Sequence, residues 1–218
     1  MTAARILLAT RNAKKLVELR RIVDAAGLAG VEIVGLADVP EFPEAPETGA
    51  TFAENALAKA RDAAAATGLP AIADDSGITV DALNGMPGIF SARWAGRHGD
   101  DDANLQLLLG QTGDVPDDRR GAAFVCAAAL VTPDGAAADA PGADGKTPGR
   151  TVVHGTWRGT LLRAPRGGNG FGYDPIFAPE GETRSSAELS AAEKDAASHR
   201  GLALRALVPH LQALLAQA

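Results

Sequence analysis

Apolar and polar positions along the chain predict strands and helices in alternation. Residues 5–10 form a short apolar run typical of a buried strand. Residues 13–26 then repeat apolar side chains at helical spacing, with Asn12 as the predicted N-cap and Gly27 as the predicted stop. VEIV at 31–34 predicts a second strand. The chain therefore begins as an α/β fold.

The middle of the chain continues this alternation. ADVPEFPEAPETG, at 37–49, is rich in Pro and Glu and predicts a loop. Thr51 and Glu54 have the spacing of a capping box, which predicts a helix that runs to about Thr67 and stops at Gly68. AIADDSG and ITVDAL then predict two short strands separated by a turn, because a glycine allows the chain to reverse sharply there.

Further elements follow towards the C-terminus. Residues 101–110 predict a helix, and residues 121–133 and 151–162 predict long strands of a mixed sheet. Residues 133–150 are low in complexity and rich in Gly, Ala and Pro, which predicts a mobile hairpin extension. The tail after Ser198 predicts an amphipathic helix, broken or kinked at Pro209.

Composition narrows the class of protein. An apolar content of 46% and a charged content of 22% are ordinary for a globular chain, so 218 residues form one generous domain or two small lobes. One cysteine, Cys126, excludes an internal disulfide and favours a reducing cytoplasm. No apolar run is long enough to span a membrane, which predicts a soluble protein. The net charge of −6 with dispersed basic residues argues against a nucleic acid polymer and favours a small anionic ligand.

Two helix starts are candidate ligand sites, and the first of them is a candidate anion site. LLATRNAKK runs from a strand through a polar turn into a helix, whose free N–H groups and positive dipole end attract anions. A capped surface helix with solvated lysines is the alternative. In ETGATFAENALAKA, Asn55 and Lys59 lie four residues apart on one helix face, and Glu47 precedes that helix. A solvated helix face is the alternative here.

Asp74 and Asp75 lie side by side in AIADDSG. Two carboxylates about 4 Å apart repel by about 4 kcal/mol at an effective dielectric of about 20. Successive residues of a regular strand point to opposite faces and would need separate partners, whereas a turn brings both acids to one cleft. A divalent cation bridged to phosphates would offset the repulsion. Turn-capping aspartates are the alternative.

The last two candidate segments supply an aromatic surface and cations. RGGNGFGYDP, at 166–175, places Phe171 and Tyr173 among glycines, which suits a flat ligand, although a plain flexible loop fits as well. Ser198 can cap the last helix and leaves His199 and Arg200 in its first turn, where cations oppose the helix dipole unless an anion is bound. Together the segments favour an anionic, metal-bound ligand with an aromatic ring, such as a nucleoside triphosphate.

Six segments in the same order resemble the non-canonical purine nucleoside triphosphate pyrophosphatases, also called inosine triphosphate pyrophosphatases or XTP/dITP diphosphatases. They are LLATRNAKK, ETGATFAENALAKA, ADDSG, GMPGIFSARWAG, GFGYDPIF and EKDAASHR, and the likeness extends from residue 5 to about 207. The resemblance implies hydrolysis of ITP, dITP and XTP to the monophosphate and pyrophosphate. It also implies an elongated mixed sheet flanked by helices, two lobes with a central cleft, one family domain over residues 1–218 and a homodimer.

The resemblance assigns roles to individual residues. It implies that Mg²⁺ is held by Glu47 and Asp75, that Asp75 accepts the proton of the attacking water, and that Lys59 and Asp74 lie near the same phosphates. The residues it implies for substrate binding are Thr10, Arg11, Asn12, Ala13, Lys14, Lys15, Ser76, Phe171, Gly172, Tyr173, Asp174, Lys194, His199 and Arg200. Many relatives carry two acids before the Thr-Gly pair, whereas here Pro46 precedes Glu47.

Two other functions fit the same residues. A nucleotide sensor without catalysis would keep the phosphate contacts, although the retention of Asp75 favours an enzyme. A pyrophosphatase for modified pyrimidines or other modified purines would keep the phosphate site and differ in the base site. Rates for ITP and XTP against ATP, GTP and dUTP separate these functions.

Overall fold

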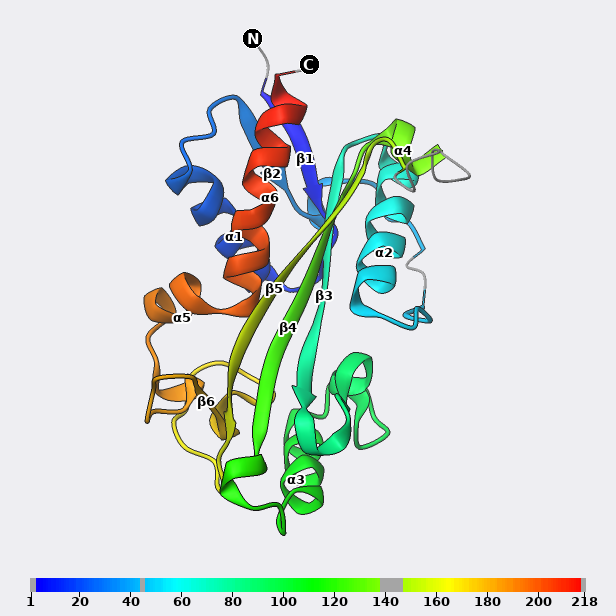
Figure 1. Cartoon of the computed structure of the whole chain (residues 1–218). Helices are drawn as coiled ribbons and strands as arrows, with labels where there is room; N and C mark the ends of the chain where they lie inside the picture. Colours follow the sequence, from blue (N-terminus) through cyan, green and yellow to red (C-terminus); the bar gives the residue numbers. More distant parts are fainter. Residues whose placement is uncertain (1–2, 44–45, 138–146, 217–218) are drawn as a thin grey trace. The chain divides into compact units, whose positions relative to one another are not determined.

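The computed structural model describes residues 3–43, 46–137 and 147–216 (Figure 1). The strands are β1 (Ala4–Leu8), β2 (Val31–Val34), β3 (Ala71–Val80), β4 (Gly121–Val131), β5 (Arg150–Leu161) and β6 (Phe177–Pro179). The helices are α1 (Ala13–Ala25), α2 (Phe52–Thr67), α3 (Asp101–Gln111), α4 (Pro133–Ala137), α5 (Ala191–Ala197) and α6 (His199–Leu215). The predicted α/β alternation is confirmed.

The strands form one six-stranded sheet in the order β2-β1-β3-β4-β5-β6. β1 pairs in parallel with both β2 and β3, while β5 and β6 are antiparallel, so the sheet is mixed as predicted. By its internal contacts the chain divides into two compact units, and β3, β4 and β5 contribute residues to both. The predicted cleft, the elongated outline and the assignment of one family domain to residues 1–218 stay predictions.

The first unit comprises residues 1–75, 127–154 and 203–218. Its core packs the alanine-rich face of α2 against β1, β3 and β4, with Ala56, Ala60 and Ala63 fully buried. Figure 1 shows α1 and α6 on one side of these strands and α2 on the other. Because side chains alternate along a strand, neighbouring residues of β3 meet different helices.

The second unit comprises residues 76–126 and 155–202. Its core gathers Ile78 and Val80 of β3, aromatic rings from β4, β5 and β6, and leucines of α3. The rings of Trp157 and Phe124 both pack edge-on against Phe177, with centroids 5.5 and 4.8 Å away. Edge-to-face packing of this kind suits buried aromatic side chains.

The predicted helix ends are largely confirmed. Asn12 caps α1 by accepting from the Lys14 N–H, and Gly27 follows the helix with φ +66°. Thr51 caps α2 by accepting from the Glu54 N–H. The Glu54 carboxylate accepts from the Ala50 N–H, so only half of the predicted capping box forms.

Two predictions near the C-terminal half need correction or restriction. α6 runs through Pro209, so the predicted break there is wrong, and the alternative of a kink at Pro209 stays a prediction. Within the predicted mobile extension at 133–150, residues 133–137 form α4, which packs on α2, so this part does bury surface. The rest of that prediction falls largely on residues 138–146, which lie outside the described residues. No helix in the described part of the chain is long and apolar enough to cross a membrane.

Candidate functional site

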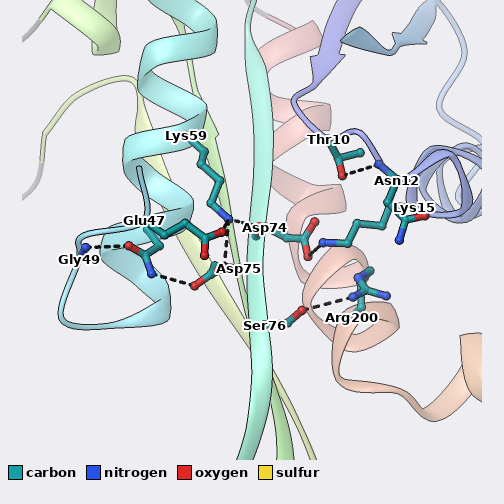
Figure 2. Close-up of polar contacts among 11 residues, drawn as sticks. Thr10, Asn12, Lys15, Glu47, Gly49, Lys59, Asp74, Asp75, Ser76 and Arg200 are labelled. Carbon is teal, nitrogen blue, oxygen red and sulfur yellow. Dashed lines mark hydrogen bonds and ion pairs between the residues drawn. The ribbon is translucent and has the colours of Figure 1, made fainter. Parts of the chain in front are cut away.

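The acidic segment AIADDSG is part of one continuous strand, β3, and not a turn between two strands as predicted. Asp74 and Asp75 therefore point to opposite faces of β3 (Figure 2). Each carboxylate meets its own lysine, Lys15 for Asp74 and Lys59 for Asp75. The repulsion between adjacent acids is thus relieved by two separate ion pairs, and the predicted gathering of both acids on one side is wrong.

The glycine of this segment has a packing role. A Cβ on Gly77 would collide with the Ser91 hydroxyl and lie 2.6 Å from the Gly88 carbonyl oxygen. The Ser91 hydroxyl accepts from the Ile78 N–H at 2.9 Å and donates to the Gly88 carbonyl at 2.6 Å. Gly77 therefore allows residues 88–91 to approach the strand closely, and it does not reverse the chain.

Asp74 faces α1. Its carboxylate accepts from the Lys15 ammonium at 2.7 Å, and its side chain is 2% exposed while that of Lys15 is 18% exposed. Lys15 lies in the first turn of α1, which is preceded by the Asn12 cap and by the Thr10 hydroxyl, an acceptor for the Asn12 N–H at 3.2 Å. The turn between β1 and α1 therefore places Lys15, paired with a buried acid, at a helix N-terminus, and the dipole of that helix end favours anions.

The other members of this turn are more open. Arg11, Ala13 and Lys14 are exposed, and each contributes to the predicted 10–15 segment. The structure thus brings Lys15 to Asp74 and leaves the side chain of Lys14 at the surface.

Asp75 faces α2. The Lys59 ammonium donates to Asp75 Oδ1 at 3.0 Å and to Glu47 Oε1 at 2.6 Å, so two carboxylates converge on one cation. Burial raises the pKa of Asp75, helped by the charge of Glu47, although the Lys59 charge and hydrogen bonds from Lys59 and Asn55 oppose the rise. Burial works to lower the pKa of Lys59, but the two carboxylates outweigh it and the pKa lies above its ordinary value.

A pocket of about 200 Å³ opens at the N-terminal end of α2, lined among others by Glu47, Glu54, Asn55 and Lys59. Carboxylate oxygens are the donors that hard divalent cations prefer, so Glu47 and Asp75 fit such an ion chemically. Among residues 3–43, 46–137 and 147–216, no group of three or more His, Cys, Asp or Glu side chains is arranged to hold a metal by itself.

The sequence predicted that Asn55 and Lys59 share one helix face, but it did not predict the contacts of Asn55. The Asn55 side chain is buried and joins the Gly49 N–H to the Asp75 carboxylate. The signal available in the sequence was an asparagine near the predicted start of a helix, four residues before Lys59, and the burial of Asn55 is seen only in the structure.

The second unit holds the residues predicted to contact a base. Ser76 Oγ accepts from Arg200 at 3.2 Å (Figure 2). The His199 ring stacks on Phe124 with centroids 5.0 Å apart. Ser198 caps α6 as predicted, by accepting from the Gly201 N–H at 3.1 Å.

Of the two aromatic rings in the glycine-rich loop, only one is available at the surface. Phe171 is 51% exposed, whereas Tyr173 is buried in the second unit's core and its hydroxyl donates to the Ser91 carbonyl at 2.8 Å. Burial, together with the nearby Asp101 charge, raises the pKa of Tyr173. Tyr173 is therefore not available to stack on a ligand as predicted, while stacking by Phe171 stays a prediction. The Gly172 N–H donates to Asp101 at 3.0 Å.

Asp174 is the polar centre of this loop. Its carboxylate accepts from the Lys194 ammonium at 2.7 Å, the Phe171 N–H at 3.0 Å and the Ser186 hydroxyl at 2.6 Å. Gly170 passes so close that a Cβ there would overlap Asp174 Oδ2 and lie 2.7 Å from Lys194 Nζ. The Asp174–Lys194 ion pair therefore requires a glycine at position 170, because any side chain there would collide with both residues.

A mixed α/β sheet that places Lys15 and Lys59 near the N-terminal ends of two helices is a fold and site of the class that suits ligands with phosphate groups. The chain belongs to the Ham1 family, whose sequence profile matches residues 6–210. The predicted family is thereby confirmed.

Individual relatives resemble the chain over nearly its whole length. It is 64% identical over 214 residues to a protein named dITP/XTP pyrophosphatase from Nocardia farcinica, covering 98% of each chain. It is 58% identical over 210 residues to the protein of that name from Mycobacterium tuberculosis, covering 96% of each.

Solved structures agree with the fold. A nucleoside-triphosphatase, dITP/XTP pyrophosphatase, from Mycobacterium abscessus matches with a TM-score of 0.74 and 58% identity, covering 95% of this chain and 99% of that one. A HAM1 protein from Coxiella burnetii matches with a TM-score of 0.82 and 41% identity, covering 96% and 98%.

Proposed function

We propose that this protein hydrolyses the non-canonical purine nucleoside triphosphates ITP, dITP and XTP to the monophosphate and pyrophosphate, and so removes them from the nucleotide pool. The observation that carries the proposal is the 64% identity, over 98% of both chains, with a protein named dITP/XTP pyrophosphatase. Water adds across the anhydride between the α and β phosphates, so no further co-reactant is needed.

The proposed metal is Mg²⁺, held by Glu47 and Asp75. Proteins commonly hold this ion through one or two carboxylates together with substrate phosphates, and the two side chains already converge on the Lys59 ammonium. When bound, Mg²⁺ supplies neutralisation of phosphate charge and a lowered pKa for its bound water.

The proposed phosphate site is formed by residues 10–15 with Lys59 and Asp74. The positive dipole end of α1 and the Lys15 ammonium bind phosphate oxygens, while Asp74 holds Lys15 at the face of β3. On the other face of β3, the Lys59 ammonium also binds phosphate oxygens, and Asp75 and Glu47 orient it. Arg11, Ala13 and Lys14 complete the segment.

Asp75 is the proposed proton acceptor for the attacking water. The Asn55 amide and the Lys59 ammonium each hold one of its two carboxylate oxygens, so the group is oriented before substrate arrives. General-base help of this kind contributes about 10² to 10⁴ in rate.

The proposed base site takes its residues from the second unit. Phe171 offers an exposed ring for stacking, and Gly172, Tyr173 and Asp174 shape the loop that carries it. The donors proposed for the 6-keto oxygen are Lys194, His199 and Arg200, and Ser76 contacts the substrate beside Arg200. The amino group of adenine cannot accept these hydrogen bonds, so ATP would lack the contacts that the 6-keto oxygen makes.

The remaining proposals concern the setting of the reaction. The partner is a small-molecule nucleotide, and neither a nucleic acid polymer nor a membrane is involved. The protein acts in the cytoplasm as a homodimer of single-domain chains.

A nucleotide panel tests the proposed function. With Mg²⁺ and a pyrophosphate assay, kcat/KM for ITP and XTP is expected to exceed that for ATP and dUTP, and the value for GTP, which also carries a 6-keto oxygen, shows whether the site rejects the 2-amino group of guanine. Equal values across the panel would contradict the 6-keto preference, and preference for dUTP would favour a pyrimidine pyrophosphatase. Tight ITP binding without pyrophosphate release would favour a sensor.

A further inference from the structure

Asn55 is a buried polar side chain in the first turns of α2, with 2% of its surface exposed. A buried amide needs partners for its oxygen and its nitrogen, because an unmade hydrogen bond in the interior is costly. The amide oxygen and the amide nitrogen of Asn55 each have a hydrogen-bond partner. These two partners indicate the role of Asn55.

The nitrogen of the amide donates to Asp75. Asn55 Nδ2 lies 3.0 Å from Asp75 Oδ2, while Lys59 holds the other oxygen, Oδ1, at 3.0 Å. With one donor on each oxygen, the plane of the carboxylate is set. A rotated amide would place its oxygen against a carboxylate oxygen, so the charge on Asp75 also sets the orientation of Asn55.

The oxygen of the amide holds the loop that carries Glu47. Asn55 Oδ1 accepts from the Gly49 N–H at 2.8 Å, two residues after Glu47. The approach is close, because a Cβ on Gly49 would lie 2.6 Å from Asn55 Oδ1 and 2.8 Å from Glu54 Cβ. One amide thus ties the loop of one carboxylate to the side chain of the other.

Asn104 shows what a purely structural asparagine looks like in the same chain. It is 1% exposed, and its amide accepts from the Ala95 N–H at 2.7 Å and donates to the Ala92 carbonyl at 3.2 Å. Both of its partners are backbone groups. Asn55 matches it in burial and in the number of hydrogen bonds, and differs in that one partner is a charged side chain of the proposed metal site.

We propose that Asn55 is a positioning residue that sets the spacing and orientation of Glu47 and Asp75, and through them the affinity of this site for a divalent cation. This inference rests on the proposed function. Groups that orient metal ligands from behind commonly change metal affinity or activity by about 10- to 100-fold when they are removed.

The experiment compares Asn55→Ala with Asn104→Ala. Mn²⁺ binding is measured by electron paramagnetic resonance without nucleotide, and the Mg²⁺ concentration for half-maximal ITP hydrolysis is measured separately. We expect Asn55→Ala to weaken Mn²⁺ binding and raise the Mg²⁺ requirement by about 10- to 100-fold. Asn104→Ala is expected to lower the thermal midpoint without changing either metal constant.

Asn55→Ser, which keeps a small polar side chain too short to span both partners, is the second variant and should show the same metal defect. Wild-type metal constants in a folded Asn55 variant would overturn the inference. So would a failure of both Asn55 variants to fold, because the amide would then be structural, or an active wild type that binds no Mn²⁺ without nucleotide. An inactive wild type on ITP would instead contradict the proposed function.

Discussion

Replacement of Lys15 by Ala tests whether the two adjacent aspartates depend on separate lysines. The Asp74 side chain is 2% exposed and accepts from the Lys15 ammonium at 2.7 Å. The variant takes this ammonium away while the carboxylate stays in the interior of the first unit. Stability should therefore fall because a buried charge has lost its opposite charge.

The size of the loss follows from the burial of the pair. Removing one partner of a buried ion pair costs about 3 to 5 kcal/mol. Lys15 keeps 18% of its side chain exposed, so water can reach part of the gap and we expect about 3 kcal/mol. At roughly 2 to 4 °C per kcal/mol for a chain of this size, the thermal midpoint should fall by about 6 to 12 °C.

Urea unfolding followed by circular dichroism measures this loss, with the exposed neighbour Lys14→Ala as the matched control. The control should change the free energy of unfolding by at most about 0.5 kcal/mol. Asp74→Asn in the Lys15→Ala background should restore most of the loss, because the buried charge is then absent. A Lys15→Ala protein as stable as the control, or a double variant no more stable than Lys15→Ala, would refute the reasoning.

Two further variants probe the two units. Asp75→Asn should lower pyrophosphate release by at least about 10²-fold while ITP binding by calorimetry stays measurable, and near-normal turnover would reject its role as base. Gly170→Ala should raise KM for ITP and lower the thermal midpoint, because φ at Gly170 is +88° and the new Cβ would overlap Asp174 beside Lys194. Gly168→Ala, with no atom within 4 Å of its Cβ, is the control. Equal effects of the two alanines would contradict the packing explanation.

Local chemistry was enough to predict most elements of the fold. The caps at Asn12 and Thr51 and the glycine after each helix formed as expected, because a side-chain acceptor and a positive φ act within one turn of the chain. The long strands β4 and β5 also lie where their apolar runs predicted. Such signals need no knowledge of distant residues.

The predicted turn at Asp74 and Asp75 was wrong because Gly77 makes room for residues that are distant in the sequence. Gly77 accommodates Ser91 and Gly88, which are more than ten residues further along the chain. A glycine required by close packing and a glycine required by a turn look alike in a sequence. The same strand geometry explains why two lysines are needed, Lys15 on one face and Lys59 on the other.

The base-site prediction failed in part for a similar reason. Tyr173 lies in a glycine-rich loop that suggested two rings open to a ligand, yet its hydroxyl reaches the Ser91 carbonyl and its ring joins the core. Only the tertiary structure separates this ring from the exposed ring of Phe171. Asn55 was likewise visible as a helix-face residue, but its link to Gly49 depends on a loop whose path the sequence does not specify.

Product analysis tests the central claim most directly. The protein is incubated with ITP and Mg²⁺, and the products are followed by phosphorus nuclear magnetic resonance. We expect inosine monophosphate and pyrophosphate in equal amounts from the start of the reaction. Inosine diphosphate with free phosphate, or unchanged ITP, would contradict the account.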